Sequence, residues 1–246
     1  MRVVSWNVEL GLNIDRAADA LLEHQDLRGA DVVLTQEMSV ESSDRLAQRL
    51  GVTSMYDSAA PHPKTGQPFG NAIMSRHELR DPMHVLLPHV ARVDGQPRSA
   101  LFATVSIDGS DVLIGSVHIE TVLLSLRRRV RQLQPIVDVV EGRAGPVVIG
   151  GDFNTASTRS RRAFERALAP SGLERLSGVD TETFRRFGRP FVLDHFFGQE
   201  VSVVKSGVTP IKQVSDHEPI WIELRDAGAG SRAVAPAEAE VEAGGT

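Results

Sequence analysis

The chain has 246 residues, of which 41% are hydrophobic and 24% charged, ordinary values for a globular protein of one large or two small domains. Its net charge of −5 argues weakly against a dedicated DNA-binding protein, because lysine and arginine contacts with phosphates supply most of that affinity. The lack of cysteine excludes disulfides, thiolate nucleophiles and cysteine-ligated zinc, and no apolar run is long enough to span a bilayer.

Segments typical of strands and helices alternate along the first half of the chain. The strand predicted at residues 2–8 begins almost at the first residue and leaves no room for a signal peptide, so we expect a cytoplasmic protein. We also expect a monomer. Apolar patterns predict the other elements. The strands fall at residues 31–37, 71–75, 83–87, 100–107 and 112–118, and the helices at residues 13–28 and 42–50.

Small polar residues, prolines and glycines predict how these elements are connected. Ser42 or Ser43 is a plausible cap for the helix at residues 42–50. Two prolines and a glycine within residues 55–67 predict a loop there. The sequence Asp-Gly-Ser at residues 108–110 predicts a tight hairpin turn.

The second half of the chain predicts one long helical stretch and further strands. Helical spacing covers residues 122–141, although Pro135 should kink or restart the helix. After Arg225 there is almost no large apolar residue, so residues 226–246 are predicted to form a disordered tail behind one domain of residues 1–225. Early strand–helix alternation and later hairpins favour an α/β (α+β) fold with two mixed sheets and outer helices. The remaining strands fall at residues 147–151, 191–197, 201–206 and 218–224, and a short helix at residues 160–168.

The most informative segment is Gly-Gly-Asp-Phe-Asn at residues 150–154. It follows a buried-strand pattern, and the spacing of two places Asp152 and Asn154 on one side of an extended chain. A carboxylate can accept a proton or bind a cation, and an amide can donate to an anionic oxygen. Together these groups suit hydrolysis of a phosphate ester, although an ordinary turn after a strand would also use these residue types.

Polar residues of the same kind also lie at or next to one end of five other predicted strands. Because open α/β sheets bind ligands at strand ends, we expect these side chains to meet in one site. Each residue on its own has an ordinary structural explanation. If none of them had a function, however, six strand ends would have to carry such residues by coincidence. The residues are Asn7, Glu37, His118, Asp194 and the pair Asp216 and His217.

The order of these motifs resembles the endonuclease/exonuclease/phosphatase superfamily over residues 2 to about 224. The resemblance implies a four-layer α/β sandwich, with two packed mixed sheets flanked by helices, as a catalytic domain at residues 1–225. The motifs specify the superfamily rather than one of its branches, which include deoxyribonucleases, sphingomyelinases and inositol polyphosphate 5-phosphatases. They read Ser-Trp-Asn-Val, Gln-Glu, Gly-Asn-Ala-Ile-Met-Ser-Arg, Val-His, Gly-Asp-Phe-Asn, Leu-Asp-His and Ser-Asp-His-Glu-Pro.

The resemblance implies a phosphoesterase that depends on Mg²⁺ or Mn²⁺. Mg²⁺ prefers hard oxygen ligands and keeps several waters. Glu37 is the best candidate ligand, with Asn7 and Asp216 beside it. A metal ion there would neutralise charge that develops on the phosphate oxygens.

The same resemblance implies roles for the other strand-end residues. Asp152 would orient or deprotonate the attacking water, and Asn154 would donate to a phosphate oxygen. Asp194 would fix the tautomer of His217 and support its cation. Either Asp152 or His217 could take the proton of the water. His118 would contact phosphate or protonate the leaving group.

Two further residues match family positions near the substrate phosphate. Arg98 could bind phosphate or be a surface arginine. Asn71 lies in the Gly-Asn-Ala motif and is expected to support His118. In pancreatic-type deoxyribonucleases a glutamate in this region pairs with that histidine, and residues 69–72 here contain none. This departure weakens the assignment to the nuclease branch.

The substrate is expected to be a small or lipid-derived phosphoester. The chain has only a short loop where nucleases carry DNA-binding loops, and Trp6 and Trp221 lie in predicted strands. DNA or RNA cleavage is the close alternative. Arginines at positions 159–162 and 185–189 should lie near the rim, where they could bind a second phosphate or remain solvated. A catalytically inactive scaffold is the third possibility, and retention of the six acidic, amide and imidazole groups argues against it.

Overall fold

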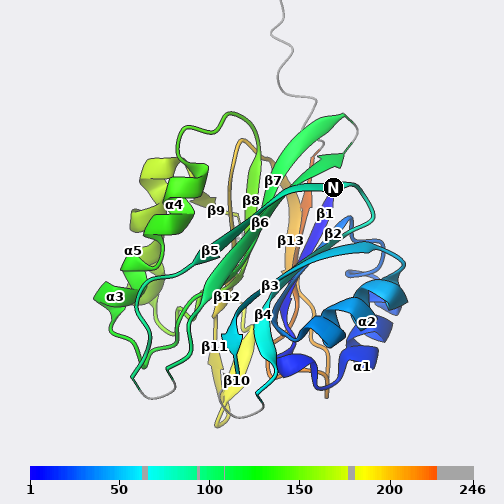
Figure 1. Ribbon diagram of the computed structural model, residues 1–246, viewed down its shortest axis with the longest axis horizontal. Helices are drawn as coiled ribbons and strands as arrows, with labels where there is room; N and C mark the ends of the chain where they lie inside the picture. The colour runs from blue at the N-terminus through cyan, green and yellow to red at the C-terminus, as the bar shows by residue number, and fades with distance from the viewer. Residues whose placement is uncertain (63–65, 93–94, 108, 177–180, 226–246) are drawn as a thin grey trace, which may run out of the picture.

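Two mixed β-sheets packed face to face form the centre of the protein (Figure 1). The computed structural model describes residues 1–62, 66–92, 95–107, 109–176 and 181–225. Within these ranges the first sheet has the strand order β13-β14-β1-β2-β4-β3, and the second has the order β5-β6-β7-β8-β12-β9. Strands β10 and β11 form a separate antiparallel hairpin.

The strands of the first sheet are β1 (Arg2–Asn7), β2 (Val32–Met38), β3 (Thr53–Pro61), β4 (Pro68–Ser75), β13 (Val203–Val208) and β14 (Ile220–Leu224). The second sheet contains β5 (Leu79–Leu86), β6 (Ser99–Ile107), β7 (Ser110–His118), β8 (Val147–Asp152), β9 (Glu174–Arg175) and β12 (Asp194–Gln199). The hairpin consists of β10 (Phe184–Arg186) and β11 (Arg189–Phe191). The helices are α1 (Ile14–Glu23), α2 (Val40–Leu50), α3 (Leu126–Arg131), α4 (Gln134–Val140) and α5 (Thr158–Leu168), with short 3₁₀ turns at Glu9–Gly11 and Ala169–Ser171.

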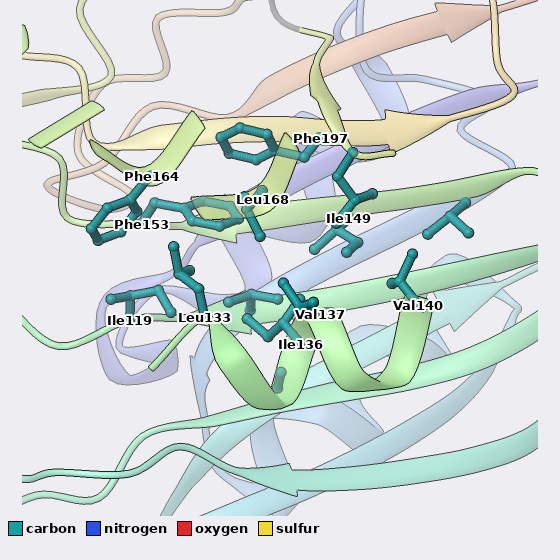
Figure 2. Close-up of a cluster of buried hydrophobic side chains, with 14 of the residues drawn as sticks. Ile119, Leu133, Ile136, Val137, Val140, Ile149, Phe153, Phe164, Leu168 and Phe197 are labelled. Atoms are coloured by element: carbon teal, nitrogen blue, oxygen red, sulfur yellow. The ribbon is translucent and has the colours of Figure 1, made fainter. Parts of the chain in front are cut away.

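The fold has four layers, helices, sheet, sheet and helices, as the resemblance implied, and three apolar clusters hold them together. Helices α1 and α2 pack on the outer face of the first sheet. A second cluster, including Leu34 and Phe196, fills the space between the sheets. The third lies between the second sheet and helices α4 and α5, where Figure 2 shows Phe153, Phe164 and Phe197 in one cluster with Ile136 of α4. The predicted α/β sandwich is therefore confirmed.

The strand pairing brings the ends of distant segments together. Strands β1 and β2 are parallel, as are β7 and β8, so their carboxyl ends share an edge of their sheets. His118 is in register with Asp152 across β7 and β8. Strand β12 runs antiparallel to β8, and its first residue, Asp194, also pairs with Asp152. The topology alone thus places three of the predicted site residues side by side.

The loop predicted at residues 55–67 is wrong over its first half. Residues 55–61 belong to β3, which pairs with β4 as far as Pro61 and Pro68. Strand β3 lies at the edge of the first sheet, where a proline need not donate a hydrogen bond to a neighbouring strand. Proline therefore marks the end of the strand here rather than its absence.

The helix predictions hold, with corrections at their ends. Helix α2 begins at Val40 and is capped by Ser39, whose hydroxyl accepts the backbone N–H of Ser42, so the predicted caps Ser42 and Ser43 are wrong. The stretch at residues 122–141 divides into α3 and α4, and Pro135 lies in the first turn of α4, where its missing N–H costs nothing. The turn residue Asp108 and the predicted tail at 226–246 lie outside the described residues.

Candidate active site

The carboxylate of Asp152 lies at the centre of the predicted strand-end residues. Its Oδ2 atom is 3.2 Å from Nδ2 of Asn7, 3.5 Å from Nε2 of His118 and 3.6 Å from Nε2 of His217. Its Oδ1 atom accepts the backbone N–H of Asn154 at 2.8 Å. A carboxylate surrounded by donors in this way is held in one orientation.

The two parts of the site that come from the first sheet are linked by hydrogen bonds. The hydroxyl of Ser215 donates to the carbonyl of Asn7 and accepts the backbone N–H of His217. The indole N–H of Trp6, which is fully buried, donates to the carbonyl of His217 at 2.9 Å. These contacts explain why the Ser-Trp-Asn and Ser-Asp-His segments, more than 200 positions apart, act as one unit.

Both ring nitrogens of His217 face carboxylates. Nδ1 lies 2.9 Å from Oδ2 of Asp194, and Nε2 faces Asp152. Asp194 is itself held by Thr183, whose hydroxyl accepts the backbone N–H groups of Leu193 and Asp194. Since ionised carboxylates only accept hydrogen bonds, this arrangement favours the doubly protonated imidazolium.

The charges in the site follow from burial and from these neighbours. Burial alone would lower the pKa of His217, but the carboxylates of Asp194 and Asp152 outweigh it and raise that pKa to about 10. Burial raises the pKa of Asp152 to about 7, against the lowering effect of His217. Burial, Arg98 and His217 together hold the pKa of His118 well below its usual value, so this imidazole is neutral near pH 7.

Glu37 lies on a β-bulge at the end of β2. The pairing of β2 with β4 is interrupted between Thr35 and Met38, and Glu37 has a φ of 60°, a left-handed backbone that is uncommon for a residue with a side chain. Its Oε1 atom accepts the Nδ2 hydrogen of Asn7 at 3.2 Å, while Oδ1 of Asn7 accepts the backbone N–H of Glu9. The bulge therefore aims Glu37 toward the other site residues.

The acidic edge of the site fits a hard divalent cation. Glu9, Glu37 and Asp216 lie close enough that burial and these two neighbours raise the pKa of Glu9. Among the described residues no arginine or lysine forms an ion pair with any of the three. Ligating atoms of Asp152, Asp194 and His217 also lie within 4.8 Å of one another, but Asp194 and His217 already bind each other. We therefore favour the oxygen-rich group around Glu37 as the metal position.

Arg98 is buried beside the site, so its interpretation as a surface arginine is wrong. Its Nη2 atom donates to Oε1 of the fully buried Glu120 at 3.3 Å, and its guanidinium lies 5.4 Å from the ring centre of Phe69, which contacts His118. The Nε and Nη1 atoms of Arg98 are buried without a hydrogen-bond partner. Unpaired N–H groups of a buried arginine suit a phosphate oxygen.

Among the described residues Asn71 forms no hydrogen bond with His118. Its amide donates to the carbonyl and to the hydroxyl of Ser99, the residue that follows Arg98. It therefore supports the segment that carries Arg98. The amide of Asn154 donates to the carbonyl of Ile119 at 2.9 Å and keeps a second N–H for another acceptor.

Sequence reasoning missed two charged residues of this region. Glu120 lies two residues beyond His118, and continuing the alternation of β7 by one step could have suggested it. Arg129 belongs to the arginine-rich segment at residues 127–131, yet it is buried and donates to the carbonyl of Asn154 at 2.7 Å. Nothing in an arginine-rich helical segment distinguishes the one residue that faces inward.

The β10–β11 hairpin adjoins the site. Phe184 forms an isolated bridge with His217, and the two rings lie 4.7 Å apart. The hairpin carries Arg185, Arg186 and Arg189 on its exposed surface, which supports their predicted position at the rim. Arg161, by contrast, is largely covered and pairs with Glu165 within α5.

The packed mixed sheets, with carboxylates, amides and imidazoles at one edge, define an α/β sandwich that carries a polar site at its strand ends. The chain belongs to the endonuclease/exonuclease/phosphatase family, whose sequence model matches residues 4–217. Members of this family are hydrolases that act on phosphoesters. Among the described residues no helix is long and apolar enough to cross a membrane.

Curated relatives match only part of the chain. A UPF0294 protein of Yersinia pseudotuberculosis and one of Yersinia pestis are each 30% identical over 129 residues, which is 52% of this chain and 48% of the relative. The match thus spans about half the length of these relatives.

Solved structures share the fold at lower identity. A family member from Beutenbergia cavernae has a TM-score of 0.73 and 23% identity, covering 92% of this chain and 71% of that one. A mannosyl-6-phosphatase from Bacteroides thetaiotaomicron has a TM-score of 0.67 and 18% identity, with 92% and 99% covered. D. rerio TDP2 complexed with single-strand DNA product has a TM-score of 0.72 and 17% identity, with 92% and 98% covered.

Proposed function

We propose that this chain is a divalent-metal-dependent hydrolase of phosphoester bonds that acts on a small or lipid-derived phosphoester. The observation that carries the proposal is the placement of His217 between two buried carboxylates, with Nδ1 at 2.9 Å from Asp194 and Nε2 at 3.6 Å from Asp152. A buried charged cluster of this kind is costly to maintain in a folded protein without a function.

Asp152 is the residue that activates the water. Because both nitrogens of His217 already face carboxylates, its imidazolium has no lone pair to offer, whereas Asp152 can accept a proton. In the proposed step the water oxygen bonds to phosphorus as its proton passes to Asp152. The bond between phosphorus and the ester oxygen breaks, and the alkoxide that leaves takes a proton from solvent to become the alcohol. His217 steadies the negative charge of Asp152, and Asp194 holds His217 in place.

Phosphate would be held by N–H groups that the fold leaves available. The candidates are the second amide hydrogen of Asn154, the imidazole of His118, which lies 3.5 Å from Asp152, and the unpaired Nε and Nη1 of Arg98, whose charge acts on His118. The low pKa of His118 favours hydrogen bonding to a phosphate oxygen over proton donation to the leaving group. Donors fixed in advance in this way stabilise the charge of the transition state.

The metal ion would be held by Glu37, with Asn7 and Asp216. When bound, Mg²⁺ or Mn²⁺ supplies positive charge that polarises the phosphate and stabilises the leaving oxygen. Glu37 is only partly covered and Asp216 is exposed, so the ion could keep several water ligands, as Mg²⁺ requires.

A nuclease is the second candidate, and the β10–β11 hairpin favours it. Phe187 at the hairpin turn is 91% exposed, and the guanidinium of Arg186 lies 5.3 Å from its ring centre. An exposed ring among arginines can stack on a base of a single strand. Against this, Trp6 is buried in the core and is not available to stack on a base.

Hydrolysis assays with matched variants test both candidates. Bis(p-nitrophenyl) phosphate, p-nitrophenyl phosphate and supercoiled plasmid would each be incubated with Mg²⁺, Mn²⁺ or EDTA. We expect turnover of a small ester that EDTA abolishes, that Asp152→Asn and Glu37→Gln remove, and that the exposed control Asp44→Asn keeps. Plasmid nicking alone would favour the nuclease. No turnover of any substrate, or turnover that survives EDTA and Asp152→Asn, would refute the proposed hydrolase.

A further inference from the structure

A basic and apolar surface lies beside the segment that enters α3. It surrounds a hollow of about 580 Å³ between that segment and the connection from β5 to β6. We call it the α3 surface and define it by Val90, Arg92, Leu123, Arg127, Arg128 and Arg131. None of these residues belongs to the proposed catalytic site.

The arginines of the α3 surface have no acidic partner in the part of the chain that the structure describes. All four are exposed, and among the described residues none of them forms an ion pair or a hydrogen bond through its side chain. Some exposed arginines elsewhere do have acidic partners, since Arg45 pairs with Asp15 and Arg80 pairs with Asp111. The chain as a whole carries a net charge of −5, so positive charge is concentrated here on an acidic protein.

Large apolar side chains stand next to these arginines in solvent. Val122 is 62% exposed and Leu123 is 57% exposed, and they adjoin each other where the chain turns toward α3. Val90 adds a third exposed apolar side chain across the hollow. Isolated exposed residues need no explanation, but an apolar tip flanked by unpaired arginines is the composition of a surface that lies in a lipid interface.

The α3 surface shares one end of the sandwich with the active site. Strand β7 ends at His118, and the same chain continues through Ile119 to the exposed Val122 and Leu123. The carbonyl of Ile119 accepts a hydrogen bond from the side-chain amide of Asn154. Arg129 of α3 donates a hydrogen bond to the backbone carbonyl of Asn154. In Figure 1 the segment entering α3 and the β10–β11 hairpin both lie in the lower half of the sandwich, away from the N-terminus.

We propose that the α3 surface docks the protein onto a lipid bilayer that carries anionic headgroups. Leu123 and Val122 enter the boundary between headgroups and acyl chains, and the guanidinium groups bind lipid phosphates. Nucleic acid would use the arginines but gain nothing from two exposed aliphatic side chains at the tip. This docking does not depend on the proposed hydrolysis, although it would hold the site close to phosphoesters at the bilayer surface.

Vesicle binding tests the proposal with the full chain. Sedimentation would compare vesicles of phosphatidylcholine alone with vesicles that also contain phosphatidylglycerol. We expect binding only to the mixed vesicles, weakened by salt because the arginine contribution is screened. Each basic residue near an anionic bilayer contributes roughly a fivefold gain in partitioning, so Arg127→Gln with Arg128→Gln should lower it by about 25-fold. Leu123→Ser should weaken the binding that persists at high salt.

The control variant removes the same number of positive charges, but from residues outside the α3 surface. Arg166→Gln with Lys205→Gln alters two exposed cations on α5 and β13 and should leave vesicle binding within about twofold of wild type, because charges beyond a Debye length are screened. Thermal melts would show that all variants fold, and turnover of a small soluble ester should match wild type in each. No binding to mixed vesicles, or equal losses in the two charge pairs, would overturn the proposal. Retention of duplex DNA by the same arginines without vesicle binding would also overturn it.

Discussion

Nδ1 of His217 lies 2.9 Å from Oδ2 of Asp194, and both side chains are buried at the edge where the two sheets meet the solvent. Asp194 begins β12, while His217 precedes β14 in the other sheet. The pair therefore joins the two sheets at the site, and its geometry depends on how they pack. In the proposed mechanism, Asp194 is therefore a positioning residue for His217 rather than a group that touches substrate.

Replacing Asp194 with asparagine should remove the charge that supports the His217 cation. We expect turnover to fall by roughly 100- to 10,000-fold, the range for losing a positioned acid–base partner. The pH profile should also change, because the pKa of His217, now raised to about 10, would drop toward the neutral range. Steady-state kinetics over a range of pH would measure both effects. Unchanged turnover in a variant that melts as wild type would show that the pair is only structural.

Replacing Glu120 with glutamine should weaken phosphate binding through Arg98. Glutamine keeps an oxygen that can accept the backbone N–H of Thr121, but it no longer fixes the guanidinium by charge. We expect inorganic phosphate to inhibit about tenfold more weakly, since hydrogen bonds to charged groups contribute roughly 1.5–3 kcal/mol. Competitive inhibition constants would measure this, and Arg98→Lys should give a similar loss.

The matched control for Glu120 is Glu141→Gln, an exposed residue beyond the end of α4. It should leave the inhibition constant unchanged. Equal phosphate affinity in Glu120→Gln and in wild type would mean that Arg98 does not contact the phosphate, and that its ion pair serves only to stabilise the fold.

The sequence predicted the layered fold and the polar strand-end residues that the structure brings together, because both depend on short-range patterns. Apolar runs located the strands, and the residue types at their ends, such as Asn7, Glu37 and Asp152, identified the chemistry. The edge strand β3 was missed because prolines usually interrupt strands, and only its place at the edge of the sheet makes Pro61 acceptable.

Contacts between distant segments could not be predicted from the pattern of any one segment. The burial of Arg98 and Arg129 depends on Glu120 and on the carbonyl of Asn154, which tertiary packing brings near them. An arginine in a basic segment has the same local pattern whether it faces inward or outward. Its role follows from which neighbour satisfies its charge.

Gly151 is required because two strands approach closely beside the site. A Cβ atom on Gly151 would lie 1.9 Å from the carbonyl oxygen of Val117, a backbone atom of β7 that cannot move aside alone. We therefore expect Gly151→Ala to destabilise the protein by about 1–3 kcal/mol or more, as overpacking does. It should also lower turnover, because Asp152 is the next residue. Urea unfolding and kinetics would measure these effects.

Gly142→Ala offers a comparison for Gly151, because its Cβ would meet no atom within 4 Å although its φ of 74° adds backbone strain. It should cost stability while leaving turnover of the folded enzyme intact. A Gly151→Ala enzyme that turns over as fast as wild type would show that β7 and β8 can separate without moving Asp152.

His195 should make the fold sensitive to acid independently of the active site. It follows Asp194 but points to the other face of β12, where its Nε2 atom lies 2.6 Å from the hydroxyl of Thr155 and its ring contacts Phe153 and Phe197. Burial, with Arg175 and Arg161 nearby, lowers the pKa of His195 to about 3. The folded protein therefore holds this imidazole neutral.

The direction of the pH effect follows from the difference between the folded and unfolded pKa values. Between the unfolded value of 6.5 and the folded value of about 3, the unfolded chain binds the proton and the folded chain does not, so stability falls as the pH decreases through this window. From about pH 7 to about pH 5 wild type should lose about 2 kcal/mol more than His195→Asn, which has no group to protonate. Urea unfolding of both proteins at each pH would measure the difference. Parallel losses in the two proteins would mean that His195 is already protonated in the folded state, with a partner that stabilises its charge.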